Sequence, residues 1–345
     1  MKQLLACCLL ASGAAYAQTP ITISVAQYPA TAATVTRYQL AATTGVAVPT
    51  KGANQSWDYR GLAPQGSVLV GTYASAGATP PFTGSNRSYA LTLAPFGVTS
   101  TAYEGFDAMG YTQLGAAVPA QSFPLTAVTG GPSDALSIPA QNIAVNLLRV
   151  PLPLTSTTLV TRTSRVVSNS LLTVLLLGLN QAAFRYVQRV ATVDSVAGWG
   201  TVRIPVAGSP AGSAPIPVLL VQRRTMQQDS FYLNNQPAPV FLLATLGQTQ
   251  GGLTYGYTHT FYRQNSAQDV LSFSYANSTF TTLTAPGTRP KLLFPWLPAP
   301  PVRWLRAASR HGLTPPPPAK PCVLRWLPWP LPNLCASLCA MRWAG

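Results

Sequence analysis

Acidic residues are scarce in this chain, which has seven Asp and Glu against 22 Lys and Arg. Exposed amphipathic helices need charged residues on their solvent face, so this composition argues against a mainly helical fold. Cysteine is absent between Gln18 and Ala285, so that region must be held together by buried apolar surface rather than by disulfides. Long hydrophobic runs are also missing, because the longest, Leu171–Leu179, is about half of what a membrane-spanning helix needs.

The first 17 residues, MKQLLACCLLASGAAYA, have the pattern of a secretory signal peptide. Lys2 gives the positive start, an apolar stretch follows, and Ala-Tyr-Ala at positions 15–17 is typical of a cleavage site. The apolar stretch is too short to span a bilayer. We therefore expect an exported mature chain that begins at Gln18.

The formal net charge of +15 is unevenly distributed. Residues 286–345 contain basic residues and no acidic ones, whereas residues 18–285 are mildly basic with arginines scattered singly. A nucleic-acid-binding surface needs basic residues gathered on one face or stripe. The sequence therefore predicts no nucleic-acid partner.

Apolar and polar residues alternate in many short segments, which is typical of half-buried strands. Gly, Pro, Ser and Asn clusters such as PTKGANQS and TGGPSD separate them, as turns do. The sequence thus predicts an all-β fold, an antiparallel β-sandwich built as one large or two smaller units. The segments with the pattern are Ile21–Tyr28, Ala33–Ala41, Ser88–Phe96, Ser122–Val128, Thr157–Val167, Tyr255–Arg263 and Asp269–Leu283.

Two places leave alternatives open. The first half of Asn169–Val190 fits a buried helix or a buried strand, and the alternation after it favours strands with a turn near Gly178–Asn180. The prolines at Pro151–Pro153 could divide residues 18–285 into two domains.

Few residues could carry catalysis. His259 is the one histidine before residue 286, and it shares a strand face with aromatic residues, where a packing role is the more common one. Glu104 and Asp107, close together in YEGFDAMGY, could form the carboxylate pair of a glycosidase. The alternative is a polar loop between strands. No cofactor or metal motif is recognisable in residues 18–285.

Two segments resemble secreted proteins of Bacteroidota. GANQSWDYRGL (Gly52–Leu62) resembles a segment near the start of those proteins, and VDSVAGWGTVRIPVAG with the strand after it (Val193–Tyr232) resembles a later part. Trp57 and Trp199 are the expected core anchors. The resemblance implies a cargo of the type IX secretion system, whose members mostly have no assigned activity and usually end in a C-terminal sorting domain.

The segment 286–345 is rich in Pro, Trp and Arg, and we expect it to be disordered. Trp and Arg together are typical of membrane-active peptides, while Cys322, Cys335, Cys339 and His311 could ligate zinc without matching a standard spacing. A third interpretation is translation in the wrong reading frame. Shifted by one base, the codons of the last residues permit Asp-Ala-Leu-Gly-Arg, which resembles the end of a sorting domain.

The sequence therefore predicts an exported, extracellular or cell-surface protein with a non-catalytic binding or structural role. It would be periplasmic if its sorting signal is lost. A glycan or surface molecule is the expected ligand, and the type IX machinery is the expected partner of an in-frame form. Two alternatives are a carbohydrate-active hydrolase that uses Glu104 and Asp107, and a membrane-active protein that acts through its tail.

Overall fold

The computed structural model describes residues 19–28, 34–40, 45–93, 97–206, 209–266 and 269–290. The predicted signal peptide (residues 1–17) and residues 291–345 of the predicted tail lie outside these ranges, and so do the predictions made for them. Residues 286–290, which were predicted to belong to the tail, form the end of a strand. In chain order the elements are η1 (Val25–Gln27), β1 (Thr34–Leu40), β2 (Gly52–Asp58), β3 (Pro64–Thr72), β4 (Ala74–Ser75), β5 (Arg87–Leu93), β6 (Val98–Asp107), β7 (Gly110–Val118), β8 (Gln121–Pro124), α2 (Thr126–Thr129), β9 (Ala135–Ile138), β10 (Gln141–Pro151), β11 (Leu159–Val174), η2 (Leu175–Leu177), β12 (Leu179–Arg203), β13 (Ile216–Leu233), β14 (Gln236–Pro237), α3 (Val240–Thr245), β15 (Leu253–Tyr262), β16 (Asp269–Tyr275) and β17 (Leu283–Pro290).

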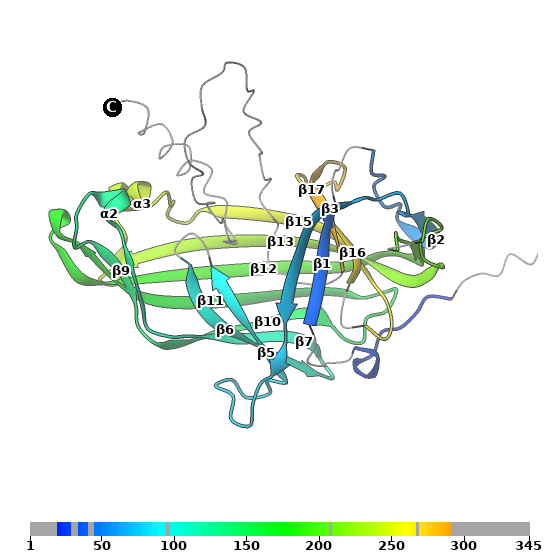
Figure 1. Ribbon diagram of the computed structural model, residues 1–345, viewed down its shortest axis with the longest axis horizontal. Coiled ribbons are helices and arrows are strands. Elements are labelled where there is room, and N and C mark those ends of the chain that lie inside the picture. The colour runs from blue at the N-terminus through cyan, green and yellow to red at the C-terminus, as the bar shows by residue number, and fades with distance from the viewer. Residues whose placement is uncertain are drawn as a thin grey trace, which may run out of the picture.

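The predicted all-β class is confirmed, because the strands form two sheets (Figure 1) that are antiparallel except for the pairing of β2. The large, 12-stranded sheet has the order β3-β1-β17-β16-β15-β13-β12-β11-β9-β8, with β14 paired to β13 and β2 to β12. The small, 5-stranded sheet has the order β10-β7-β6-β5-β4. The sheets meet where β10 runs beside β11, and there the Ser164 hydroxyl donates to the Val145 carbonyl over 2.5 Å.

Side chains on the large sheet alternate between two faces, as they do on any strand. On β13, Leu219 and Val221 face the small sheet and pack with Tyr111 and Val150 from its strands. We call this the inner face. Val218 and Leu220 point the other way, to the outer face, where they pack in a different cluster.

The outer face is covered at one end of the molecule. Residues 45–62 lie over it there, and Trp57 and Tyr59 are buried among aromatic side chains of the sheet. The Trp57 ring meets the ring of Phe261 edge-on at 5.0 Å. At the other end of the molecule, α2 and α3 lie together (Figure 1). Buried Leu125, just before α2, and buried Leu242 and Leu243 of α3 pack in one cluster with Phe184 and Phe231 of the inner face.

The two segments that carry the family resemblance lie against each other. Strand β2 pairs in parallel with the end of β12, from Gly198 to Arg203. A Cβ atom on Gly200 would lie 1.9 Å from the Gln55 carbonyl oxygen, and one on Gly198 would lie 2.7 Å from the Gly52 carbonyl oxygen. The glycines on both sides of Trp199 are therefore required by the close approach of β2.

The turn predicted within Asn169–Val190 is confirmed, since β11 ends at Val174 and β12 begins at Leu179. The strand predicted at Ile21–Tyr28 is wrong. Ile23 makes an isolated bridge to Leu154, and η1 follows because the Gln27 side chain accepts a hydrogen bond from the Ser24 backbone over 3.1 Å.

Two other predicted strands are too long. In the segment Ser122–Val128 the strand ends at Pro124. Leu125 is then buried in a hydrophobic cluster, and α2 begins at Thr126. The segment Asp269–Leu283 is broken after Tyr275, because the Asn277 side chain accepts a hydrogen bond from the Thr281 backbone and closes a turn.

The predicted boundary near residue 151 coincides with a change of sheet. Strand β10 ends the small sheet at Pro151, a cis peptide bond joins Leu152 to Pro153, and β11 of the large sheet follows. Strands before and after this point both belong to the large sheet. A division into two domains stays a prediction.

Candidate functional site

Glu104 lies in the middle of β6 and is completely buried between the sheets. One carboxylate oxygen pairs with the Arg87 guanidinium at 2.6 Å, and the other accepts a hydrogen bond from the Tyr111 hydroxyl. The guanidinium also lies 3.8 Å from the ring centre of Tyr73 and 4.6 Å from that of Phe106. Burial acts to lower the pKa of Arg87, but the Glu104 carboxylate outweighs it and raises that pKa above its ordinary value.

Asp107 lies in different surroundings, exposed at the turn between β6 and β7. Its carboxylate accepts hydrogen bonds from the backbone N–H groups of Met109 (2.8 Å) and Gly110 (3.1 Å). Aspartate side chains commonly stabilise turns in this way. A glycosidase pair needs both carboxyl groups open to the same sugar. The geometry gives no support to a joint role of Glu104 and Asp107, and the hydrolase interpretation stays a prediction.

His259 is completely buried on the outer face of β15. Its ring stacks on Phe280 at 4.7 Å, and its nitrogens face the Tyr275 hydroxyl (3.0 Å) and the Gln222 amide oxygen (3.5 Å). Burial, with a smaller contribution from Lys51, lowers the pKa of His259 to about 4. The ring is therefore neutral at neutral pH, and it hydrogen-bonds to no carboxylate that could orient it as a catalytic base.

Sequence reasoning missed a second buried ionic cluster on the inner face. Asp194 of β12 pairs with Arg162 of β11 and Arg223 of β13, each at 2.7 Å. Both guanidinium groups also donate to the Arg149 carbonyl of β10, which ties the two sheets together. Burial acts to raise the pKa of Asp194, but the two arginines outweigh it and lower that pKa. No local sequence pattern could predict this cluster, because its members come from four strands.

Asp229 is a third buried carboxylate of the inner face. One oxygen accepts hydrogen bonds from Tyr186 (2.6 Å) and Gln227 (3.3 Å), and the other is buried with no partner. Burial raises the pKa of Asp229 because no cation offsets it. Thus Glu104 and Asp194 are neutralised by arginines, while Asp229 is held by neutral donors.

Exposed cationic and aromatic side chains lie together in the middle of the outer face. Neighbouring residues of β11, β12, β13 and β15 form three rows across that face. The rows are Thr161, Val193, Arg224 and Tyr257; Thr163, Ala191, Met226 and Tyr255; and Arg165, Arg189, Gln228 and Leu253.

We call these rows the arginine–tyrosine face. Tyr255 is 54% exposed and Met226 is 41% exposed, and Arg165 and Arg189 are exposed as well. Sequence analysis did not single these residues out. The alternation of each strand indicates which side chains share a face. Which of them form a row depends on the register between strands, which the structure supplies.

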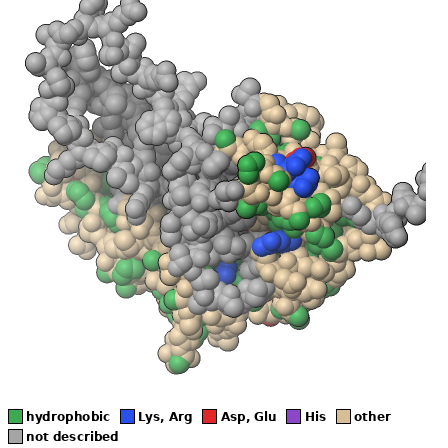
Figure 2. Space-filling model, turned by 45° about the vertical axis from the view of Figure 1, so that its right-hand side comes forward, with side chains coloured by type: hydrophobic (Ala, Val, Ile, Leu, Met, Phe, Trp, Pro, Cys, Tyr) green, Lys and Arg blue, Asp and Glu red, His purple; other side chains and the backbone are tan. Residues whose placement is uncertain are grey.

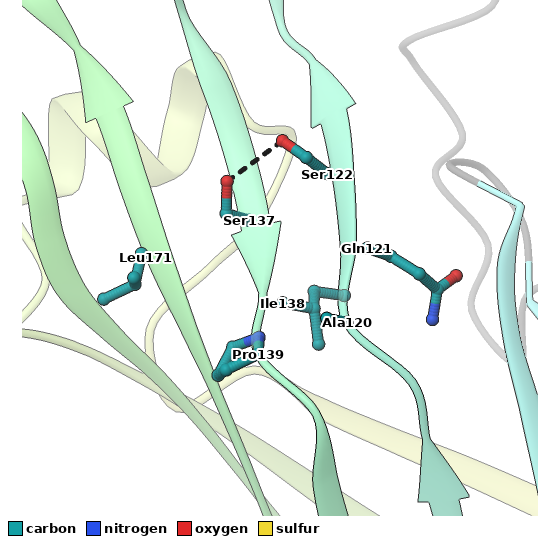
Figure 3. Close-up of a pocket in the computed structure, with 7 residues that line it drawn as sticks. All are labelled: Ala120, Gln121, Ser122, Ser137, Ile138, Pro139 and Leu171. Atoms are coloured by element: carbon teal, nitrogen blue, oxygen red, sulfur yellow. Dashed lines mark hydrogen bonds between the residues drawn. The ribbon is translucent and has the colours of Figure 1, made fainter.

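A shallow hollow of about 380 Å³ lies at the edge of the large sheet, between β8, β9 and β11. Figure 3 shows its lining, in which the Ser122 and Ser137 hydroxyls are hydrogen-bonded to each other at 3.0 Å. The other residues are Ala120, Gln121, Ile138, Pro139 and Leu171. With no charged side chain, this lining has little with which to recognise a polar ligand.

No family model, curated protein or solved structure matches the chain. Within the described ranges, no helix is long and apolar enough to cross a membrane, and no group of three or more His, Cys, Asp or Glu side chains is arranged to hold a metal ion. The four residues considered for zinc lie outside the described ranges.

Proposed function

We propose that this protein is an exported, non-catalytic binding protein and that its binding surface is the arginine–tyrosine face. The observation that supports the proposal is where the reactive groups lie. Glu104, Asp194 and His259 are buried and hydrogen-bonded inside the fold. Cationic and aromatic side chains, in contrast, are exposed together on an open sheet surface.

The resemblance to secreted proteins of Bacteroidota supports the extracellular part of the proposal. Its two segments form one local unit, in which β2 pairs with β12 beside Trp199. Partly buried Trp199 packs against the core between the sheets. Delivery by the type IX machinery would act through the region after residue 285, in its in-frame form.

The experiment is a binding screen of the full chain against glycan arrays and intact bacterial surfaces. We expect retention by at least one surface or glycan, and we expect Tyr255→Ala to weaken it without changing the thermal midpoint, because Tyr255 is exposed. Release of soluble sugars from a bound polysaccharide would instead establish a hydrolase. Retention that is unchanged in Tyr255→Ala would refute the proposed binding surface.

A further inference from the structure

The arginine–tyrosine face carries positive charge that the fold does not neutralise. Arg165 and Arg189 lie directly opposite each other on β11 and β12, and neither side chain makes a hydrogen bond or ion pair with another described residue. Like charges in opposite positions destabilise a pair of strands. Arg224 adds a third guanidinium two rows away and lies 5.7 Å from the ring centre of Phe280.

None of the seven acidic residues of the chain lies in the three rows. Glu104, Asp134, Asp194, Asp229 and Asp269 are buried. Asp58 pairs with Arg60 at 2.5 Å, and Asp107 caps its turn. No carboxylate lies in the three rows, so an acidic group that pairs with these arginines would have to come from another molecule. On the side of the molecule shown in Figure 2, the described surface shows basic side chains in a few places and hardly any acidic ones.

The shape of the face indicates an extended ligand. Four strands span about 15 Å across the sheet, and the three rows span a similar length along it. Small ligands are normally enclosed by a concave pocket, whereas this is an open sheet surface. The ring of exposed Tyr255 can pack against the apolar face of a sugar, and guanidinium groups pair with carboxylates in a planar, two-pronged geometry.

We infer that the arginine–tyrosine face binds an acidic polysaccharide, in which uronate or sulfate groups pair with Arg165 and Arg189 while a sugar ring packs on Tyr255. This inference rests on the proposed binding function and adds the ligand class. Duplex DNA is the less suitable polyanion, because its dense phosphates are usually met by more cationic contacts, about six to ten.

The test measures binding of the full chain to polygalacturonate, alginate and chondroitin sulfate by affinity electrophoresis and calorimetry. Methyl-esterified polygalacturonate provides the same polymer without charge, and duplex DNA provides a competing polyanion. Arg263→Gln is the matched control, because Arg263 is an exposed arginine in the loop after β15.

We expect at least one of the acidic polysaccharides to bind. Arg165→Gln and Arg189→Gln should each weaken binding about threefold, which is the effect expected from the loss of one exposed ion pair. Tyr255→Ala should weaken binding about three- to tenfold. Methyl esterification should remove most of the binding, while Arg263→Gln should leave it unchanged. The two arginine variants should be as stable as the wild type or slightly more so, because each relieves the like-charge contact.

Three results would overturn the inference. One is binding to none of the three acidic polymers. Another is equal weakening by Arg263→Gln and Arg165→Gln, which would show attraction by net charge alone. A third is binding to DNA that is as tight as binding to the best polysaccharide. If a neutral glycan or a cell surface binds instead, and Tyr255→Ala weakens that binding, the ligand class is wrong while the binding function stands.

Discussion

Replacing Glu104 by glutamine tests whether this buried carboxylate belongs to the core rather than to an active site. Glutamine keeps the volume of the side chain, and its amide oxygen can still accept the Tyr111 hydrogen bond. What it removes is the negative charge beside Arg87, which is 5% exposed and has no other carboxylate as a hydrogen-bond partner. Breaking a buried ion pair in this way costs about 3–5 kcal/mol in typical cases.

The structure points to the lower part of that range. The rings of Tyr73 and Phe106 lie against the guanidinium and continue to stabilise the cation by about 1 kcal/mol. We therefore expect Glu104→Gln to lower the free energy of unfolding by about 3 kcal/mol. Arg87→Met alone should cost a similar amount, because it leaves the carboxylate buried and unpaired.

The double variant, Glu104→Gln with Arg87→Met, isolates the pair. Its loss of unfolding free energy should be clearly smaller than the sum of the losses in the two single variants, because the second substitution removes the charge that the first one left unpaired. Urea unfolding followed by circular dichroism at the strand band is the suitable assay. Tryptophan fluorescence is less suitable, because most tryptophans of the chain follow residue 290. A loss below about 1 kcal/mol in Glu104→Gln, or strict additivity in the double variant, would refute this account.

Three other variants test separate parts of the structure. Burial lowers the folded-state pKa of His259 to about 4, below its ordinary value. The free energy of unfolding should therefore fall by about 3 kcal/mol as pH drops from 6.5 to 4. In His259→Gln, the free energy of unfolding measured in urea should depend less on pH in that window, and an unchanged pH dependence would contradict the assignment. Asp229→Asn should leave stability at pH 7 within about 1 kcal/mol of the wild type, because this carboxylate has neutral partners and a pKa raised by burial; a loss as large as that of Glu104→Gln would argue against it. Gly200→Ala should cost about 2–4 kcal/mol, because its Cβ would collide with the β2 backbone, and hydrogen exchange should speed up in β2 but not at the far end of β11; normal protection of β2 would show that the strand tolerates the methyl group.

Where the sequence predicted a strand correctly, the segment carries a sustained alternation of apolar and polar residues. The pattern at Tyr255–Arg263 corresponds to β15, and the predicted turn near Gly178 separates β11 from β12. It failed at Ile21–Tyr28, where the deciding contact is the bridge from Ile23 to Leu154, far along the chain. It failed again after Tyr275, where Asn277 closes a turn inside an otherwise alternating segment.

The candidate site was harder to predict, because it depends on which strands are neighbours. Nearness in sequence suggested that Glu104 and Asp107 act together, yet one lies inside the sandwich and the other caps a turn. The cluster of Asp194 needs arginines from neighbouring strands. Likewise, Arg165 and Arg189 become neighbours through the register of β11 and β12, which no window of sequence contains.

The most direct measurement of the central claim is the dissociation constant of the full chain for an acidic polysaccharide, compared between Arg165→Gln and Arg263→Gln. Both substitutions remove one positive charge, and they differ in whether that charge belongs to the arginine–tyrosine face. We predict binding about threefold weaker in Arg165→Gln and unchanged in Arg263→Gln. Equal dissociation constants for the two variants would contradict the claim that this face is the binding surface.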